Sequence, residues 1–203
     1  IADNTFVVFT SDNGPHDEPG AVWGSHEHPA PTQNPAFFRS YGPMDGIKRD
    51  LWEGGLRVPC LVYAPGIIKK NHNSNFPSQF HDWMATFADL AGVPKPMRCD
   101  GVSLLPTLQG NDAAQKDGVV YSEYNFGGGM AQYQDYAPNK RGRARGEQQA
   151  IVFRAEDGRY LKAIRTNIKS ANDDFEVYDV AADSHESTNI ADQFPGIQEK
   201  LKA

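Results

Sequence analysis

The sequence has few cysteines, no excess of positive charge and no long hydrophobic run. Its two cysteines, Cys60 and Cys99, could pair or stay free, so they leave the redox compartment open. The formal net charge of -6 argues against nucleic acid as the main partner. No apolar stretch reaches the length that a membrane span needs. What remains is an ordinary globular composition, in which 203 residues suffice for one sizeable core.

The sequence also lacks a starting methionine. It begins with Ile1, and residues 1–4 resemble the end of a helix that turns into a strand. We therefore expect the natural protein to extend further towards the N-terminus. No signal peptide is visible, but with such a start this absence carries no weight.

An apolar run that ends in Asp-Asn-Gly is the first notable feature. Residues 6–9 (Phe-Val-Val-Phe) have no polar alternation, which predicts a strand buried on both faces, as in parallel sheets. Open α/β sheets bind ligands beyond the carboxyl ends of such strands, where Asp12 and Asn13 lie. Their side chains offer hard oxygen ligands suited to calcium or magnesium, and Gly14 permits a sharp turn after them. Taken alone, however, these three residues favour a simple turn.

A second run makes the turn interpretation less favourable. Residues 48–59 (Lys-Arg-Asp-Leu-Trp-Glu-Gly-Gly-Leu-Arg-Val-Pro) lead into an apolar stretch and do not form a generic turn pattern. Together with residues 10–16 (Thr-Ser-Asp-Asn-Gly-Pro-His), 37–38 (Phe-Phe), 42–43 (Gly-Pro) and 46–48 (Gly-Ile-Lys), the run resembles the later half of the type I sulfatase family. The motifs occur in the family's order, and the resemblance implies its alkaline-phosphatase-like α/β fold.

This resemblance implies a metal and a sulfate contact. The ion is expected to be calcium, with magnesium less favoured, and Asp12 and Asn13 are expected to be two of its ligands, the remaining carboxylates coming from the start of the enzyme. Lys48 matches the family's sulfate-contacting lysine through its spacing to Glu53. It is therefore predicted to bind the substrate and to act as the catalytic positive charge. Without the resemblance, Lys48 would be taken for a surface lysine.

Other polar residues near these motifs receive weaker assignments. His16 lies three residues after Asn13 and is either a substrate contact or a loop histidine. His26 and His28 match no standard zinc motif, and we expect a solvated loop. Glu53 and Arg57 are expected to form a structural ion pair that holds the loop.

The nucleophile is missing from the sequence. In the family it is a formylglycine, made from Cys or Ser in a Cys/Ser-x-Pro-x-Arg context, and neither Cys60, Cys99 nor any serine here fits. The family's general-acid histidine also precedes the Asp-Asn-Gly motif. The resemblance therefore implies the later half of a sulfatase, inactive by itself, whose partners are its N-terminal half and a sulfated small molecule or glycan. It also implies an extracytoplasmic (periplasmic or secreted) or lysosomal location.

The predicted fold class is α/β: the later part of a mostly parallel sheet with flanking helices, plus a small C-terminal α+β subdomain with antiparallel strands. We divide it into residues 1–115, carrying the metal and sulfate segments, and residues 116–203. Expected elements are strands at 58–64, 119–124, 150–155, 159–165 and 175–180, a hairpin at 156–158, and helices at 81–92 and 190–203.

Three finer expectations concern side chains. The helix at 81–92 places Trp83, Phe87 and Leu90 on one face, which we interpret as core packing. Its first residues, His81 and Asp82, are interpreted as helix-start residues. The arginines of residues 141–145 form either a basic rim that attracts an anionic substrate or, preferably, a solvated charged loop.

Two other functions stay open at this point. One is a phosphatase or phosphonate hydrolase of the same superfamily, which a Thr or Ser nucleophile in a different context would favour. The other is a non-catalytic carbohydrate-binding or assembly module that kept the fold without the chemistry. Calcium titration and a search for the formylglycine would separate the second from a sulfatase.

Overall fold

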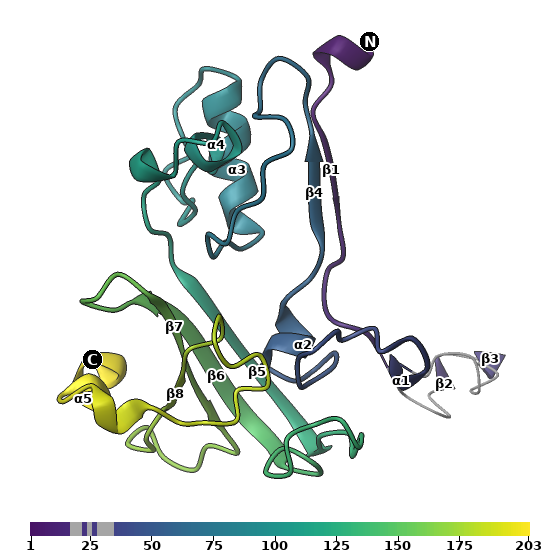
Figure 1. Ribbon diagram of the computed structural model, residues 1–203, viewed down its shortest axis with the longest axis vertical. Helices are drawn as coiled ribbons and strands as arrows, with labels where there is room; N and C mark the ends of the chain where they lie inside the picture. The colour runs from purple at the N-terminus through teal and green to yellow at the C-terminus, as the bar shows by residue number, and fades with distance from the viewer. Residues whose placement is uncertain (17–21, 24–25, 28–34) are drawn as a thin grey trace. The chain divides into compact units, whose positions relative to one another are not determined.

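The computed structural model describes residues 1–16, 22–23, 26–27 and 35–203, which fold into two compact units (Figure 1). Unit 1 consists of Ile1–Thr10, Pro59–Tyr121 and Ile151–Tyr160, and unit 2 consists of Ser11–Val58, Ser122–Ala150 and Leu161–Ala203. The predicted division between residues 115 and 116 stays a prediction. His28, predicted to lie in a solvated loop, lies outside the described residues.

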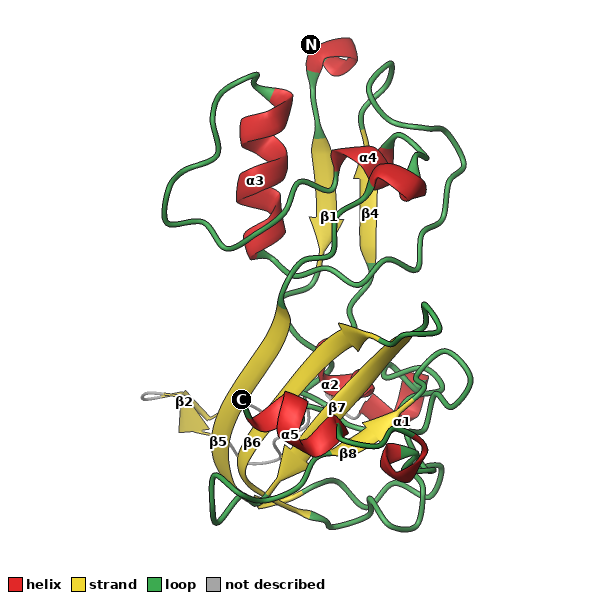
Figure 2. Cartoon of the chain, turned by 90° about the vertical axis from the view of Figure 1, so that its left-hand side faces the viewer, coloured by secondary structure: helices red, strands yellow, loops and turns green. Residues whose placement is uncertain are grey.

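Unit 1 is built on a pair of strands. β1 (Val7–Thr10) runs antiparallel to β4 (Cys60–Tyr63), with Val7 opposite Tyr63 and Thr10 opposite Cys60. The prediction of a strand buried on both faces of a parallel sheet is therefore wrong for this pair. Phe9 is 66% exposed, as is Leu61 opposite it. The other face is half-buried, because the ring of Phe6 packs edge-on against Trp83 and Phe87 of helix α3 (His81–Leu90). Figure 2 shows this helix beside the strand pair.

Helix α3 (His81–Leu90) forms where it was predicted, and Gly92 follows it with a φ of +66°. Its buried side is not the expected aromatic one, since Phe87 is 45% exposed while Asp82 and Thr86 are almost fully buried. The rings of Trp83 and Phe87 each form a T-shaped contact with the ring of Phe6.

The polar side chains of α3 explain this orientation. The Asp82 carboxylate accepts hydrogen bonds from the backbone N–H of Gln79 (2.8 Å) and of Val102 (2.9 Å). The Thr86 hydroxyl donates to the Asp82 carbonyl (2.7 Å) and accepts from the backbone N–H of Leu104 (2.9 Å). Asp82 is thus a helix-start residue, as predicted, and it also fastens the segment that follows the helix.

Most of a four-stranded sheet belongs to unit 2, and its order is β5-β6-β7-β8. The strands are β5 (Val120–Gly129), β6 (Ala144–Arg154), β7 (Tyr160–Thr166) and β8 (Glu176–Tyr178). The predicted hairpin between β6 and β7 is confirmed, with Gly158 at a φ of +88°. The predicted C-terminal α+β subdomain with antiparallel strands is confirmed, since β7 and β8 run antiparallel and a helix follows them.

The remaining elements are short. They are η1 (Ala2–Asn4), β2 (Val22–Trp23), β3 (His26–Glu27), α1 (Pro35–Phe38), α2 (Glu53–Leu56), α4 (Leu105–Leu108), η3 (Asp112–Ala114), η4 (Ala191–Gln193) and α5 (Ile197–Lys202). Among the described helices, none has the length and apolar character required to span a bilayer.

The core of unit 2 holds the loop that carries Lys48. Two neighbours of Lys48, Ile47 and Leu51, are buried, and Trp52 is fully buried. The whole cluster consists of Tyr41, Ile47, Leu51, Trp52, Met130, Tyr136, Ala150, Ile164 and Tyr178. Because the loop supplies several of its members, its backbone is fixed by packing around Lys48, whose own side chain is half-buried.

Candidate functional site

Two backbone hydrogen bonds bring the predicted site segments together within unit 2. The N–H of Gly14 donates to the carbonyl of Gly55 (2.9 Å), and the N–H of Lys48 donates to the carbonyl of Pro15 (2.8 Å). The segment with Asp12, Asn13 and His16 therefore lies along the loop with Lys48 and Glu53. All four predicted site residues are thus on adjacent segments, although their roles stay predictions.

Glycines make this close approach possible. A Cβ atom on Gly14 would lie 2.1 Å from the carbonyl oxygen of Gly54, and one on Gly54 would lie 2.2 Å from that of Gly46. Gly14 does lie in a bend, as predicted, but its φ is not positive. The requirement for glycine therefore comes from backbone packed against backbone, which the sequence alone did not reveal.

The Asp12 and Asn13 side chains already meet. The Asn13 amide Nδ2 donates to Asp12 Oδ1 at 2.5 Å, and the Ser11 hydroxyl donates to the Asn13 carbonyl at 3.0 Å. Asp12 is exposed and Asn13 is half-buried. A cation could take the Asp12 carboxylate directly, and Asn13 would turn its amide to present oxygen.

These two residues fit a calcium site only as part of its ligand set. Calcium takes about six to eight oxygen ligands. In the part of the chain that the structure describes, no group of three or more His, Cys, Asp or Glu side chains could hold a metal ion. Asp12 and Asn13 supply the right type of donor, but other ligands are needed to complete the site.

The Lys48 loop is fixed by a buried carboxylate that sequence reasoning did not single out. Asp50 accepts a hydrogen bond from the backbone N–H of Ile47 (2.9 Å), which closes the turn around Lys48. Its Oδ1 also accepts from Arg145 Nε at 2.6 Å. Asp50 is 1% exposed, so this partner is needed to offset the cost of burying its charge.

The other two arginines of residues 141–145 are also engaged. Arg143 forms a two-pronged pair with Glu176 (2.8 and 3.1 Å), and Arg141 donates to the backbone carbonyl of Tyr136 (2.9 Å). The preferred interpretation, a solvated loop, is therefore wrong for Arg143 and Arg145, which pair with carboxylates, and the alternative of a substrate-attracting rim stays a prediction. The cause is that Asp50 and Glu176 lie opposite these side chains, and an alternate spacing of charges does not reveal such partners.

A second buried charge cluster holds helix α2. The predicted pair of Arg57 and Glu53 is confirmed at 2.7 Å. Glu53 also meets Lys162 (3.0 Å), and Lys162 meets Glu186 (2.9 Å). In addition, Glu186 accepts a hydrogen bond from the backbone N–H of Glu53 (2.8 Å). The available sequence signal was a lysine inside the apolar run of β7, where a charge needs partners.

Burial and charge oppose each other in this cluster. Burial alone would raise the pKa of Glu53, but the charges of Lys162 and Arg57 outweigh it, and the pKa is lowered. Burial would lower the pKa of Lys162, but Glu186 and Glu53 raise it instead. For Glu186, burial and the nearby Glu53 raise the pKa despite the attraction of Lys162. The cluster thus keeps Lys162 charged and shares it between two carboxyl groups.

The chain is similar to known sulfatases. Residues 1–93 match the family model described as Sulfatase. Steryl-sulfatase of Rattus norvegicus is 35% identical over 128 residues, which is 62% of this chain and 19% of that protein. N-acetylgalactosamine-6-O-sulfatase of Bacteroides thetaiotaomicron is 29% identical over 209 residues, which is 99% of this chain and 35% of that protein. The chain thus spans about a third or less of the length of these relatives.

Solved structures show the same fold. One, in complex with its substrate D-glucosamine-2-N,6-O-disulfate, has a TM-score of 0.58 and 23% identity over 98% of this chain and 33% of its own. Another, from work on glycosaminoglycan metabolism by Bacteroides thetaiotaomicron, has a TM-score of 0.59 and 24% identity over 98% and 38%. These two structures show that the chain has an alkaline-phosphatase-like α/β fold. Within that class, residues 1–93 match the sulfatase family, and sulfatases are similar to the chain along almost its whole length.

Proposed function

We propose that this chain is the later part of a sulfuric ester hydrolase, in which Lys48 holds the sulfate group. The observation that supports this most directly is the pair of backbone hydrogen bonds, Gly14 to Gly55 and Lys48 to Pro15. They align the Asp-Asn-Gly segment with the lysine loop, so a sulfate beside Lys48 would also lie close to Asp12 and Asn13. This alignment supports the proposal that the two motifs form one site.

The chemistry requires positive charge around the non-bridging sulfate oxygens. Lys48 is a point charge on a loop fixed by the core and by Asp50, so little reorganisation is needed when charge develops in the transition state. His16 follows Pro15, whose carbonyl holds Lys48, and we propose that it contacts the substrate. Asp12 and Asn13 would hold calcium, with magnesium less favoured. When bound, that ion supplies Lewis-acid charge on the sulfate oxygens.

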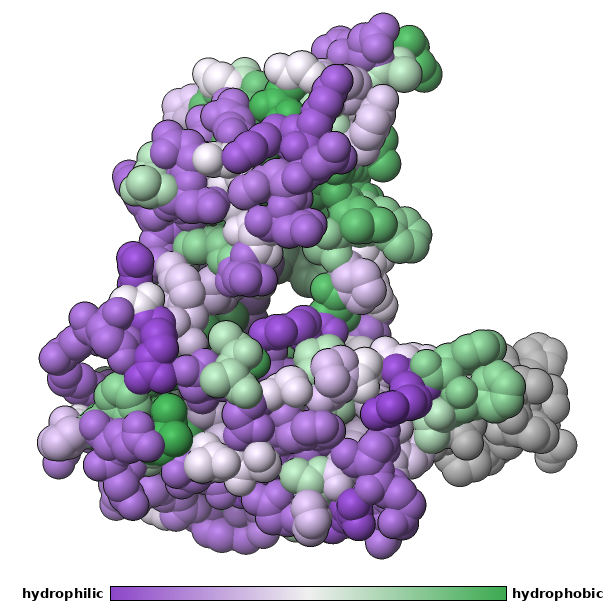
Figure 3. Space-filling view, in the orientation of Figure 1, coloured by the Kyte–Doolittle hydropathy of each residue, from purple (hydrophilic) through white to green (hydrophobic). Residues whose placement is uncertain are grey.

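We further propose that the nucleophile, a formylglycine, lies upstream of this chain. An N-terminal half would supply it together with the remaining metal ligands, so this chain alone would be inactive. The exposed apolar face of β1 and β4 supports such a partner. Apolar side chains gather along these strands (Figure 3). Val7, Phe9, Leu61 and Tyr63 are 46%, 66%, 66% and 59% exposed.

The substrate class is proposed as sulfate esters of small molecules or glycans. Relatives named for steryl and for N-acetylgalactosamine sulfates are about equally similar, so identity does not choose between them. By the same family likeness, we propose that the whole protein works outside the cytoplasm (periplasmic or secreted) or in a lysosome.

The test uses the complete polypeptide. Lys48→Ala should lower kcat/KM for an aryl sulfate about 100-fold or more, with the melting temperature unchanged. Asp12→Ala should weaken calcium affinity measured by titration, whereas Lys116→Ala, which removes an exposed lysine of unit 1, should change neither. Near-normal turnover in Lys48→Ala would remove this lysine from the mechanism.

Mass mapping upstream of Ile1 separates the alternatives. A Cys/Ser-x-Pro-x-Arg segment with its first residue converted to an aldehyde supports the sulfatase. A different nucleophile would favour a phosphatase or phosphonate hydrolase; a phosphonate monoester hydrolase from Agrobacterium radiobacter shares the fold, with a TM-score of 0.53 and 19% identity. With no nucleophile at all, a non-catalytic carbohydrate-binding or assembly module would be the better conclusion.

A further inference from the structure

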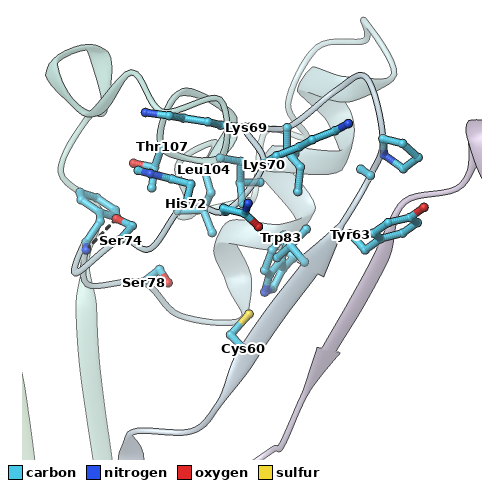
Figure 4. Close-up of a pocket in the computed structure, with 17 residues that line it drawn as sticks. Cys60, Tyr63, Lys69, Lys70, His72, Ser74, Ser78, Trp83, Leu104 and Thr107 are labelled. Atoms are coloured by element: carbon cyan, nitrogen blue, oxygen red, sulfur yellow. Dashed lines mark hydrogen bonds between the residues drawn. The ribbon is translucent and has the colours of Figure 1, made fainter.

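Unit 1 contains a cavity that is separate from the predicted sulfate site. Its volume is about 640 Å³, and it lies between β4, α3, α4 and residues 65–78 (Figure 4). This size suits a small organic ligand. None of the four predicted site residues lines it, because all of them belong to unit 2.

The cavity combines an apolar wall with a polar rim. Trp83, Leu104 and Val62 provide apolar surface. Lys69 and Lys70 extend along the rim above Trp83 and Cys60 in Figure 4. Such a lining suits a ligand with an apolar or sugar-like body and a negatively charged group.

A buried hydroxyl in the cavity is without a hydrogen-bond partner. Thr107 is only 6% exposed, and its Oγ1 has no partner among the residues that the structure describes. Buried polar groups in folded proteins nearly always have one. The backbone N–H of Thr107 donates a hydrogen bond to Gln115 Oε1 (3.2 Å), so it is the side-chain hydroxyl that lacks a partner. An oxygen-rich ligand group would satisfy it.

The charges around the cavity favour an anion. His72 lines it as well, and its Nε2 is 3.9 Å from Asp112 Oδ1, beyond hydrogen-bonding distance. The Asp112 side chain is 61% exposed, so solvent screens most of its effect. The position of Lys69 is set by its backbone N–H, which donates to the carbonyl of Leu108 (2.9 Å). Two exposed lysines thus stand at the rim of this cavity, with their ammonium groups on opposite sides of it in Figure 4, in a chain whose net charge is -6.

We infer that this cavity is a second ligand site, which binds a small organic oxyanion such as a sulfate or phosphate monoester. The charged group meets Lys69 and the Thr107 hydroxyl, Lys70 adds positive charge on the other side of the rim, and the organic body packs against Trp83. Sulfate and phosphate esters share this chemistry, so both serve as probes. The inference does not rest on the proposed catalytic function, because it uses none of the residues of the Lys48 loop.

The experiment measures binding of phenyl sulfate, phenyl phosphate, inorganic sulfate and phenol by calorimetry, using the whole chain in its Lys48→Ala form so that the first site does not contribute. At least one of the two phenyl esters should bind more tightly than inorganic sulfate or phenol. A Lys69→Ala/Lys70→Ala variant should lose affinity about tenfold, and Lys116→Ala should keep it.

Thr107→Val separates binding from structure. The valine keeps the shape and removes the unpaired hydroxyl, so stability should stay equal or rise while affinity falls about threefold. Bound ester should also slow alkylation of Cys60, which lines the cavity, but not of Cys99, which does not.

Several results would contradict the proposed second site. Absence of saturable binding by both phenyl esters would overturn the inference, as would equal affinity in the lysine double variant and Lys116→Ala. Equal protection of both cysteines would indicate a general effect on folding, and would also reject the site. Turnover of the complete enzyme enters none of these measurements, so failure of the proposed function and failure of this site are distinguishable.

Discussion

Lys140 is a buried cation whose ammonium group has no hydrogen-bond acceptor in the described structure. Its Nζ lies 2.8 Å from the ring centroid of Trp52 and 4.7 Å from that of Tyr178. These rings favour the charged form, and Glu186 does so as well. Burial outweighs them and lowers the pKa of Lys140 to about 7.

This lowered pKa predicts a rise of stability with pH. An unfolded chain keeps the Lys140 proton up to its ordinary pKa of 10.5, whereas the folded protein releases it near pH 7. The unfolded state therefore binds more protons between these values, and the free energy of unfolding should rise by about 2 kcal/mol from pH 7 to pH 9. Urea unfolding at each pH measures this. In Lys140→Met the rise should disappear; if it persists, another group causes it.

At the residue scale, sequence reasoning selected candidate site residues but did not reveal what holds them in place. Asp12, Asn13 and Lys48 were selected because their motif spacing is distinctive. Asp50, which fixes the Lys48 turn, was missed because its partner Arg145 is 95 residues away. Contacts between residues so distant in sequence leave no local pattern.

At the scale of elements, helix α2 is held by charge rather than by its own length. It has only four residues, too few to be stable alone. Glu53 within it is bound by Arg57 from its own end and by Lys162 from β7, while Glu186 accepts from its backbone. The position of α2 next to the Lys48 loop thus depends on one buried lysine between two carboxyl groups.

Lys162→Met should therefore destabilise the protein by about 3–5 kcal/mol, because it leaves two carboxyl groups buried without their shared cation. Chemical denaturation followed by circular dichroism gives the value. Lys169→Met, which changes an exposed lysine of the same unit, is the matched control and should change stability by less than about 0.5 kcal/mol. Similar losses in both variants would mean that the cluster adds little.

The elements themselves were largely predictable, and their burial was not. The strands predicted at 119–124, 150–155 and 159–165 follow from β-branched and aromatic runs. β5 continues to Gly129 and β6 already begins at Ala144, through glycine-rich and polar residues that such runs do not mark. Helix α3 follows from its spacing of apolar residues. Which face of an element is covered depends on its neighbours in space, so the exposed side of β1 and the half-exposed side of α3 could not be read from the sequence.

At the scale of the whole molecule, the exposed face of β1 and β4 determines how the chain behaves alone. Contiguous apolar surface promotes association. We expect the isolated chain to self-associate, and Leu61→Lys to reduce this in light scattering, because it places a charge in the middle of the face. Val119→Lys, at a residue that is 56% exposed outside this face, should have little effect. Equal effects of the two variants would argue against the face as the cause.

The arrangement of unit 2 also has a consequence during synthesis. Glu53 emerges from the ribosome long before its partners, since the residue whose carboxylate accepts its backbone N–H comes 133 positions later. At about 5–20 residues per second, this delay is roughly 7 to 27 seconds. For that time the apolar segment around Trp52 has no completed core to enter. We therefore expect the nascent chain to bind chaperones. The yield of folded protein in cells should depend on the translation speed between residues 58 and 186.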